Sequence, residues 1–190
     1  MRTYILNMKK NIIAFCLGVL CCVSYSWAGI PFKISPGTAQ IGEARSLDGH
    51  KVSVVAFLSS ECPCSDSHIS ELTRLQAMYP QVNFLGIHTS VFSDLAGTKA
   101  YYQNKKVNFP VYVDGDLKIT SELKAVKTPH VFVFAQDGKL VYQGGVSDSS
   151  RFSYHKKNYL AEVLAAVQSG KSSPYSFKRT LGCYIKRDKL

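Results

Sequence analysis

The sequence lacks the features that mark fibrous, repetitive or disordered proteins. It contains no internal repeat and no low-complexity stretch, and charged residues make up only 19% of it. Hydrophobic residues make up 46%, which is typical of a globular protein and excludes a disordered or collagen-like chain. The length of 190 residues is sufficient for one domain with a sizeable core.

No apolar run reaches the roughly 20 residues that a membrane-spanning helix needs. The uncharged run at residues 11–23 follows two lysines and precedes the small residues Ser26 and Ala28. This order of basic, apolar and small residues is typical of a secretory signal peptide. We therefore predict a signal peptide over residues 1–28, cut after Ala28, and a periplasmic or secreted protein.

Removal of residues 1–28 changes both the charge and the cysteine count. The formal net charge falls from +10 to +7, and the six cysteines become three, namely Cys62, Cys64 and Cys183. Disulfides form and persist in the oxidising compartments outside the cytoplasm. The three remaining thiols are therefore candidates for disulfide chemistry.

Acidic residues are scarce near the C-terminus. Residues 171–190 hold six basic side chains and one acidic side chain, whereas residues 29–170 are nearly neutral. We predict a domain over residues 29–170, followed by a solvated basic tail over 171–190 that carries Cys183. Because the charge does not lie on the domain, we expect no nucleic-acid partner. Contact between the tail and an anionic membrane is the less favoured alternative.

Short β-branched runs alternate with helical patterns along the domain. Strands are predicted at residues 52–58, 82–89, 109–113, 131–135 and 140–144, and helices at about 65–78, 93–104, 117–124 and 156–168. This order predicts an α/β protein with a mixed central sheet flanked by helices on both faces. Either Ser65 or Asp66 is expected to cap the first helix.

Cys62 and Cys64 follow the first predicted strand directly. Chemistry in α/β proteins is usually located at the carboxyl ends of the strands, and the start of a helix favours a negative charge. A free cysteine has a pKa of about 8.5 and is mostly a thiol at neutral pH. The start of a helix lowers this pKa, so the position favours the reactive thiolate. A second thiol nearby supplies the resolving partner that disulfide exchange needs.

Several segments resemble the thioredoxin-fold redoxins, in particular the exported AhpC/TSA-like and TlpA-like thiol–disulfide proteins. They are FLSSECPCS at 57–65, Thr128-Pro129, VFVFAQDGKLVYQGG at 131–145 and GCYIK at 182–186. The resemblance implies a thioredoxin-like fold and a cis Pro129 opposite the cysteines, with Thr128 facing them. It also implies that the segment before Pro129 pairs with a substrate backbone. The expected partner is a protein or a small thiol, and no cofactor or metal is expected.

The spacing of the cysteines departs from the Cys-x-x-Cys of thioredoxins. In one alignment Cys62 is the nucleophile, whereas in the other Cys64 takes the second position and Glu61 falls where the nucleophile belongs. We favour the first, because Cys-Pro directly after the strand is the redoxin pattern. Glu61 is then expected to raise the pKa of the neighbouring thiol, against the effect of the helix.

The partner of Cys62 stays open at this point. A bridge to Cys64 closes a very short loop, which in the chain-entropy account is worth roughly 1.6 kcal/mol, and strain is expected in it. A bridge to Cys183 closes about 120 residues and is worth roughly 5 kcal/mol. Cys183 is thus a structural tether, a resolving thiol or a free thiol, and the predicted function is thiol–disulfide oxidoreduction with Cys62 as nucleophile.

Two alternative functions were weighed against this prediction. A thiol peroxidase of the peroxiredoxin type is favoured by Ser59, three residues before Cys62, but Val55 stands where that family has proline and only Arg151 is available as an activating arginine. A Cu(I)-binding chaperone is the other, because soft thiolates favour Cu(I). In that case His68, four residues after Cys64 on one helix face, is the candidate third ligand.

Overall fold

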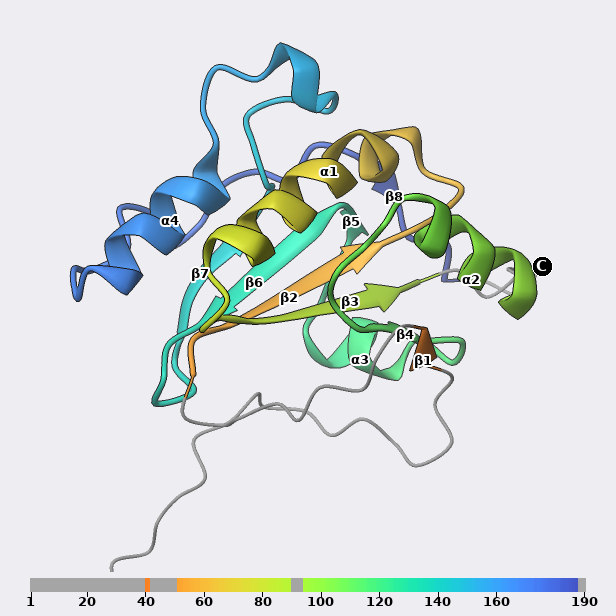
Figure 1. Ribbon diagram of the computed structural model, residues 1–190, viewed down its shortest axis with the longest axis horizontal. Helices are drawn as coiled ribbons and strands as arrows, with labels where there is room; N and C mark the ends of the chain where they lie inside the picture. Colours follow the sequence, from red (N-terminus) through yellow and green to blue (C-terminus); the bar gives the residue numbers. More distant parts are fainter. Residues whose placement is uncertain (1–39, 42–50, 90–93, 188–190) are drawn as a thin grey trace, which may run out of the picture.

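The structure is a computed structural model that describes residues 40–41, 51–89 and 94–187. A six-stranded mixed sheet in the order β1-β4-β3-β2-β6-β7 forms its centre (Figure 1). The strands are β1 (Gln40–Ile41), β2 (Ser53–Leu58), β3 (Asn83–His88), β4 (Val111–Val113), β6 (His130–Phe134) and β7 (Leu140–Gly144). Strands β2, β3 and β4 are parallel, and β6 runs antiparallel to β2 and β7.

Helices cover both faces of this sheet (Figure 1). They are α1 (Pro63–Met78), α2 (Leu95–Asn104), α3 (Lys118–Glu122) and α4 (Tyr159–Gln168), with a 3-10 turn at Phe152–Tyr154. Leu72 of α1 and Leu164 of α4 pack with Val54 on one face. Ile119 of α3 packs with Phe57 on the other. The predicted α/β architecture is confirmed.

Strand β2 is central to the sheet and buried along its whole length. All six of its residues pair with β3 on one side, and the first five pair with β6 on the other. A strand that is covered on both faces needs apolar residues at every position, which explains the run that predicted this strand. The rigid position of β2 fixes the place where the chain emerges toward Cys62.

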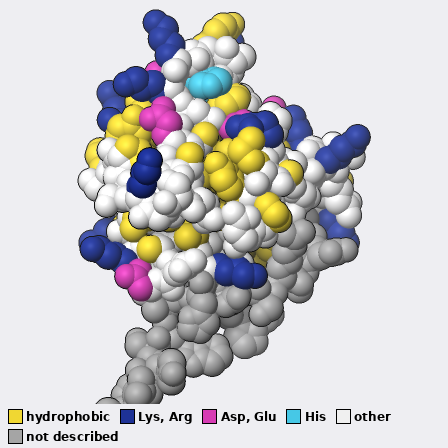
Figure 2. Space-filling model, turned by 60° about the vertical axis from the view of Figure 1, so that its left-hand side comes forward, with side chains coloured by type: hydrophobic (Ala, Val, Ile, Leu, Met, Phe, Trp, Pro, Cys, Tyr) yellow, Lys and Arg dark blue, Asp and Glu magenta, His cyan; other side chains and the backbone are white. Residues whose placement is uncertain are grey.

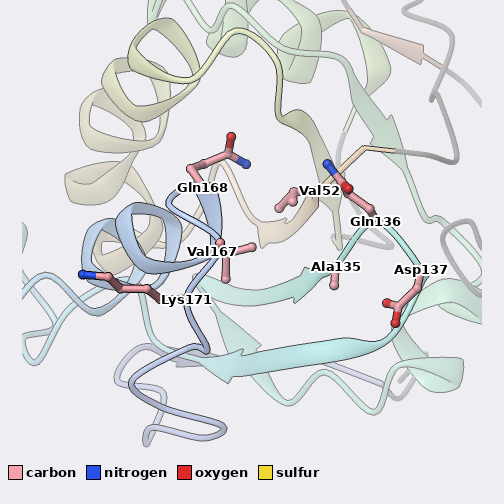
Figure 3. A pocket seen from close by; sticks show the side chains of 8 residues that line it. Val52, Ala135, Gln136, Asp137, Val167, Gln168 and Lys171 are labelled. Carbon is pink, nitrogen blue, oxygen red and sulfur yellow. The ribbon is translucent and has the colours of Figure 1, made fainter.

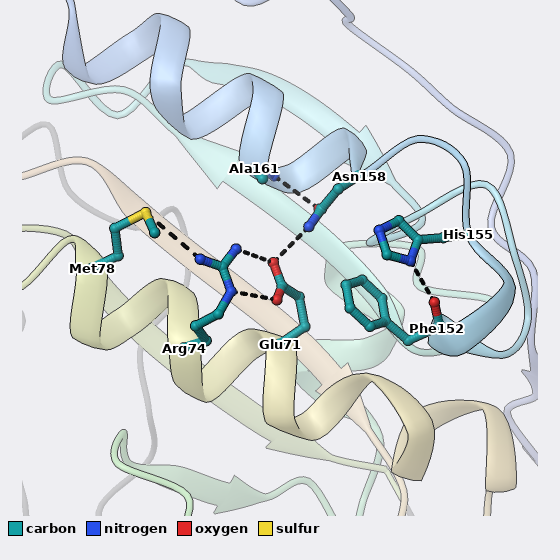
Figure 4. Close-up of polar contacts among 7 residues, drawn as sticks. All are labelled: Glu71, Arg74, Met78, Phe152, His155, Asn158 and Ala161. Carbon is teal, nitrogen blue, oxygen red and sulfur yellow. Dashed lines mark hydrogen bonds and ion pairs between the residues drawn. The ribbon is translucent and has the colours of Figure 1, made fainter.

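A buried polar network joins α1 to the start of α4 (Figure 4). The carboxylate of Glu71 is only 4% exposed and accepts hydrogen bonds from Arg74 at 2.7 Å and from Asn158 Nδ2 at 2.6 Å. Asn158 Oδ1 in turn accepts the N–H of Ala161 at 3.1 Å. Helix α4 therefore begins after Asn158, later than the sequence predicts, because this side chain caps it.

The basic C-terminal segment is not only a solvated tail in the part that the structure describes, up to residue 187. Its strand β8 (Cys183–Tyr184) pairs antiparallel with β5 (Lys127–Thr128). Thr180 and Ile185 are buried, and Arg187 donates a hydrogen bond to the carbonyl oxygen of Ala125. Many other side chains of the segment are exposed, as expected of a solvated segment, but charge alone does not reveal this short run of apolar and strand-forming residues.

Basic side chains are dispersed on the surface in view. Figure 2 shows Lys and Arg scattered among hydrophobic and uncharged side chains over the face that it presents. None of the helices that the structure describes is both long and apolar enough to cross a membrane. The predicted signal peptide, residues 1–28, lies outside the described residues and stays a prediction.

His130, the first residue of β6, is a polar residue in an apolar setting. It is 5% exposed, and its ring lies 4.5 Å from that of Phe132 between centroids. Neither ring nitrogen has a hydrogen-bond partner among the described residues. Burial lowers its pKa to about 4, so the folded protein holds the ring neutral, whereas the unfolded chain protonates it near pH 6.5.

This difference predicts a loss of stability in mild acid. Between pH 6.5 and pH 4 the unfolded state binds the extra proton, so the contribution of His130 is present above pH 6.5 and is lost as the pH falls through that range. The loss amounts to about 3 kcal/mol by pH 4. The free energy of unfolding can be measured with urea at pH 7 and at pH 4 for the unmodified protein and for His130→Phe. The drop between the two pH values should be smaller in His130→Phe by about this amount. An identical pH dependence in both proteins would contradict the assignment.

Candidate active site

Three cysteines from two distant parts of the chain meet at the carboxyl end of β2. The Sγ atoms of Cys62, Cys64 and Cys183 all lie within 4.8 Å of one another. Cys62 follows β2, Cys64 lies in the first turn of α1, and Cys183 belongs to β8. Figure 1 shows β8 beside β5, near the start of α1. The structure thus brings together the three cysteines that the sequence singles out.

Cys62 caps α1. Its Sγ accepts the backbone N–H of Ser65 at 3.3 Å, and Pro63 is the first residue of the helix. The prediction that Ser65 or Asp66 is the cap was wrong, because proline is suited to the first helical position and leaves the preceding residue as the cap. The thiol therefore lies directly at the positive end of a 16-residue helix.

Thr128 and Pro129 lie against Cys62, as the resemblance implies. The peptide bond between them is cis. The carbonyl oxygen of Thr128 accepts a hydrogen bond from Cys62 Sγ at 3.2 Å, and Thr128 pairs with Cys183 across β5 and β8. One short strand thus contacts both of these cysteines.

The three thiols differ in their tendency to ionise. Burial opposes ionisation of Cys62, but hydrogen bonds from the side chains of Cys183 and Thr128 and from the N–H of Ser65 outweigh it and lower the pKa of this thiol. Burial and the neighbouring Cys62 raise the pKa of Cys64, and the same two causes raise the pKa of Cys183 to about 12. The cluster thus favours a single thiolate at Cys62, and the opposing effect expected of Glu61 does not prevail.

His68 does not join the cysteine cluster. It is 1% exposed, its Nδ1 lies 2.8 Å from the carbonyl oxygen of Cys64, and its Nε2 lies 2.9 Å from Ser147 Oγ. Because a carbonyl only accepts, Nδ1 carries the proton and Nε2 accepts from the serine. Both nitrogens are therefore engaged, and the candidate ligand set of Cys62, Cys64 and His68 does not form.

Sequence reasoning missed the role of Gly182. A side chain built at this position would place its Cβ 2.0 Å from the carbonyl oxygen of Thr128, so only glycine lets β8 approach β5 this closely. The GCYIK segment was the available signal. Sequence reasoning also missed the contacts of Asp66 with Lys105 and with the hydroxyl of Tyr101, which hold the start of α1 against α2.

A surface pocket lies at the end of β2 opposite to the cysteines, and Figure 3 shows the side chains that line it. It is lined by residues at the start of β2, at the turn between β6 and β7, and after α4, including Val52, Asp137 and Lys171. The length of β2 separates it from Cys62. No cysteine lines the pocket, so the cysteine cluster is the candidate site for disulfide chemistry.

Comparison with known proteins identifies solved structures with a similar fold. An uncharacterized conserved protein from Geobacillus kaustophilus is 24% identical, with a TM-score of 0.67 over 74% of this chain and 79% of that one. A hypothetical protein from Sinorhizobium meliloti 1021 is 23% identical, with a TM-score of 0.67 over 75% and 82% of the two chains. A thioredoxin-like protein solved in its oxidized form is 17% identical, with a TM-score of 0.61 over 77% and 99%.

These likenesses define a thioredoxin-like fold, here with a cysteine cluster at the carboxyl end of β2. No curated protein gives a significant match to the sequence. The family profile described as redoxin matches residues 36–163. The chain belongs to the redoxin family.

Replacement of Gly182 by alanine is expected to release β8. The new methyl group would overlap the Thr128 carbonyl oxygen, so Cys183 should leave the cluster. Peptide-resolved mass spectrometry should show Cys183 alkylated by iodoacetamide at least about tenfold faster, since each 1.4 kcal/mol of lost docking energy is tenfold. Gly115→Ala is the matched control, because a Cβ there meets nothing within 4 Å. Equal alkylation rates in both variants would refute the role of Gly182.

Proposed function

We propose that this protein is an exported thiol–disulfide oxidoreductase with Cys62 as the nucleophile and a protein or small thiol as its partner. The observation that carries the proposal is the meeting of the three Sγ atoms within 4.8 Å, next to the cis peptide bond before Pro129. Membership of the redoxin family supports the same chemistry at a general level. Export rests on the signal-like sequence of residues 1–28.

The proposed reaction has two exchange steps. The Cys62 thiolate attacks one sulfur of a partner disulfide, a mixed disulfide forms, and the other partner sulfur leaves as a thiolate. A second thiol of this chain loses its proton and attacks Cys62 Sγ, so a disulfide forms within the chain and the partner is released. The partner gains two electrons and the protein loses two. The reverse steps oxidise a dithiol, and the reduction potential sets the direction.

Cys183 is the resolving thiol in this proposal. Its side chain and its backbone N–H both hydrogen-bond to Cys62, and β8 holds it at that distance by pairing with β5. A bridge from Cys62 to Cys64 would instead join two residues separated only by Pro63 at the start of a helix, where strain is expected. The long loop that Cys183 closes also contributes more stability.

The placement of β8 bears on how a protein partner would bind. An extended peptide commonly binds by adding a strand to an exposed edge, and β8 lies on the edge of β5 directly before Pro129. In the proposed cycle, a partner segment displaces β8 when it reaches Cys62, which is only 3% exposed. The return of β8 then brings Cys183 back and expels the partner.

The peroxidase alternative has less support. Val55 of β2 is fully buried in the core on the face of the sheet that α3 covers. The hydroxyl of Ser59 accepts the N–H of Glu61 at 3.2 Å. Arg151 is exposed and acts on Cys64 rather than on Cys62. Disulfide exchange therefore fits the contacts around Cys62 better than peroxide reduction.

Serine variants of the three cysteines should separate their roles. Cys62→Ser is expected to lower the rate of insulin disulfide reduction at least about 100-fold, because the nucleophile is lost. With oxidised glutathione, Cys183→Ser should accumulate a Cys62–glutathione mixed disulfide that mass spectrometry detects, whereas Cys64→Ser should still resolve it.

Two results would contradict this assignment. Full activity of Cys62→Ser would exclude exchange through this thiol. Accumulation of the mixed disulfide in Cys64→Ser, with normal resolution in Cys183→Ser, would make Cys64 the resolving thiol.

A further inference from the structure

We propose that Cys62, Cys64 and Cys183 form a three-coordinate site for Cu(I) in the reduced protein. This inference goes beyond disulfide exchange, because it concerns a ligand that the reduced thiols hold rather than a reaction that they perform. It requires a different third ligand from the one that the sequence suggested, since Cys183 replaces His68.

The positions of the sulfur atoms fit such a site. Three sulfurs around one metal ion, with bonds of about 2.3 Å, lie about 4 Å apart. The three Sγ atoms already lie within 4.8 Å of one another. Side-chain rotations that move each sulfur by less than about an ångström would therefore bring the three sulfurs to the spacing of a three-coordinate metal site. Cys62 and Cys64 lie at the start of α1 and Cys183 lies in β8, so two elements of the fold hold the three ligands.

The composition of the cluster favours Cu(I) over other metal ions. Soft thiolates select Cu(I), Zn(II) or iron–sulfur clusters, and Zn(II) in a structural site requires four protein ligands. Among the described residues, the group consists of three cysteines, and no histidine, further cysteine or carboxylate belongs to it as a fourth ligand. His68, the nearest candidate, has both ring nitrogens occupied by Cys64 and Ser147.

The surroundings stabilise the negative charge that three thiolates around a monovalent ion would carry. The backbone N–H of Ser65 points at Cys62 Sγ, and the positive end of α1 lies at the same place. Arg151 acts favourably on the Cys64 thiolate. The half-buried setting of Cys64 and Cys183 leaves the ion a route in from the surface.

Metal binding and the disulfide exclude each other, because the metal ligand is the thiolate and a sulfur in a disulfide is no longer a thiolate. Only the fully reduced chain offers three ligands, and each ligand loses its proton as the ion binds. A disulfide between any two cysteines leaves a single thiol. The oxidised protein is therefore expected to bind no Cu(I).

The test is an anaerobic titration with Cu(I) supplied as its bicinchoninate complex. The chain should carry serine at Cys16, Cys21 and Cys22, so that only the three cluster thiols remain. We expect one equivalent of Cu(I) per chain. X-ray absorption at the copper edge should show three sulfur neighbours at one distance and no nitrogen.

Variants then identify the third ligand. Cys183→Ser should weaken Cu(I) binding more than about 100-fold, since even a neighbour of a ligand costs 10–100-fold. His68→Gln should leave the affinity unchanged and is the matched control for the rival ligand set. A spectrum with two sulfurs, or with a nitrogen neighbour, in the chain that keeps all three cluster thiols would overturn the proposal, as would unchanged affinity in Cys183→Ser. These readouts do not involve disulfide exchange, so either proposal can fail alone.

Discussion

The pairing of β8 with β5 is the contact on which the site depends. It joins two residues on each side, yet it brings the C-terminal segment across about 120 residues of sequence to the start of α1. Gly182 permits the close approach to Thr128, and Ile185 is buried in the second core beside Phe57. Without this pairing, the site would contain Cys62 and Cys64 alone, which only Pro63 separates in the sequence.

The same contact influences which of the three thiols ionises first. Cys62 receives hydrogen bonds from the N–H of Ser65 and from the side chains of Thr128 and Cys183, and these lower its pKa against the effect of burial. The pKa values of Cys64 and Cys183 are raised, because each is buried beside Cys62. One thiolate next to two thiols is the arrangement that exchange chemistry requires, since an attacking group and a resolving group are both present.

The sequence predicted most of the fold, because the elements that build the sheet carry local signals. The buried run at residues 52–58 and the turn before residues 140–144 are examples, and both strands are present. It did not predict that Cys62 caps α1, because cysteine is not an ordinary capping residue. The docking of β8 was also missed, because a two-residue strand has no periodicity and its partner lies far away in the sequence. The sequence also did not predict that His68 hydrogen-bonds to Ser147, because that residue lies on a loop far away in the sequence.

The claim that Cys183 is the thiol partner of Cys62 is tested most directly by disulfide mapping. The purified protein would be oxidised gently, digested without reduction and analysed by mass spectrometry. We expect a peptide in which Cys62 is linked to Cys183, with Cys64 free. A bridge between Cys62 and Cys64, with Cys183 free, would contradict the account.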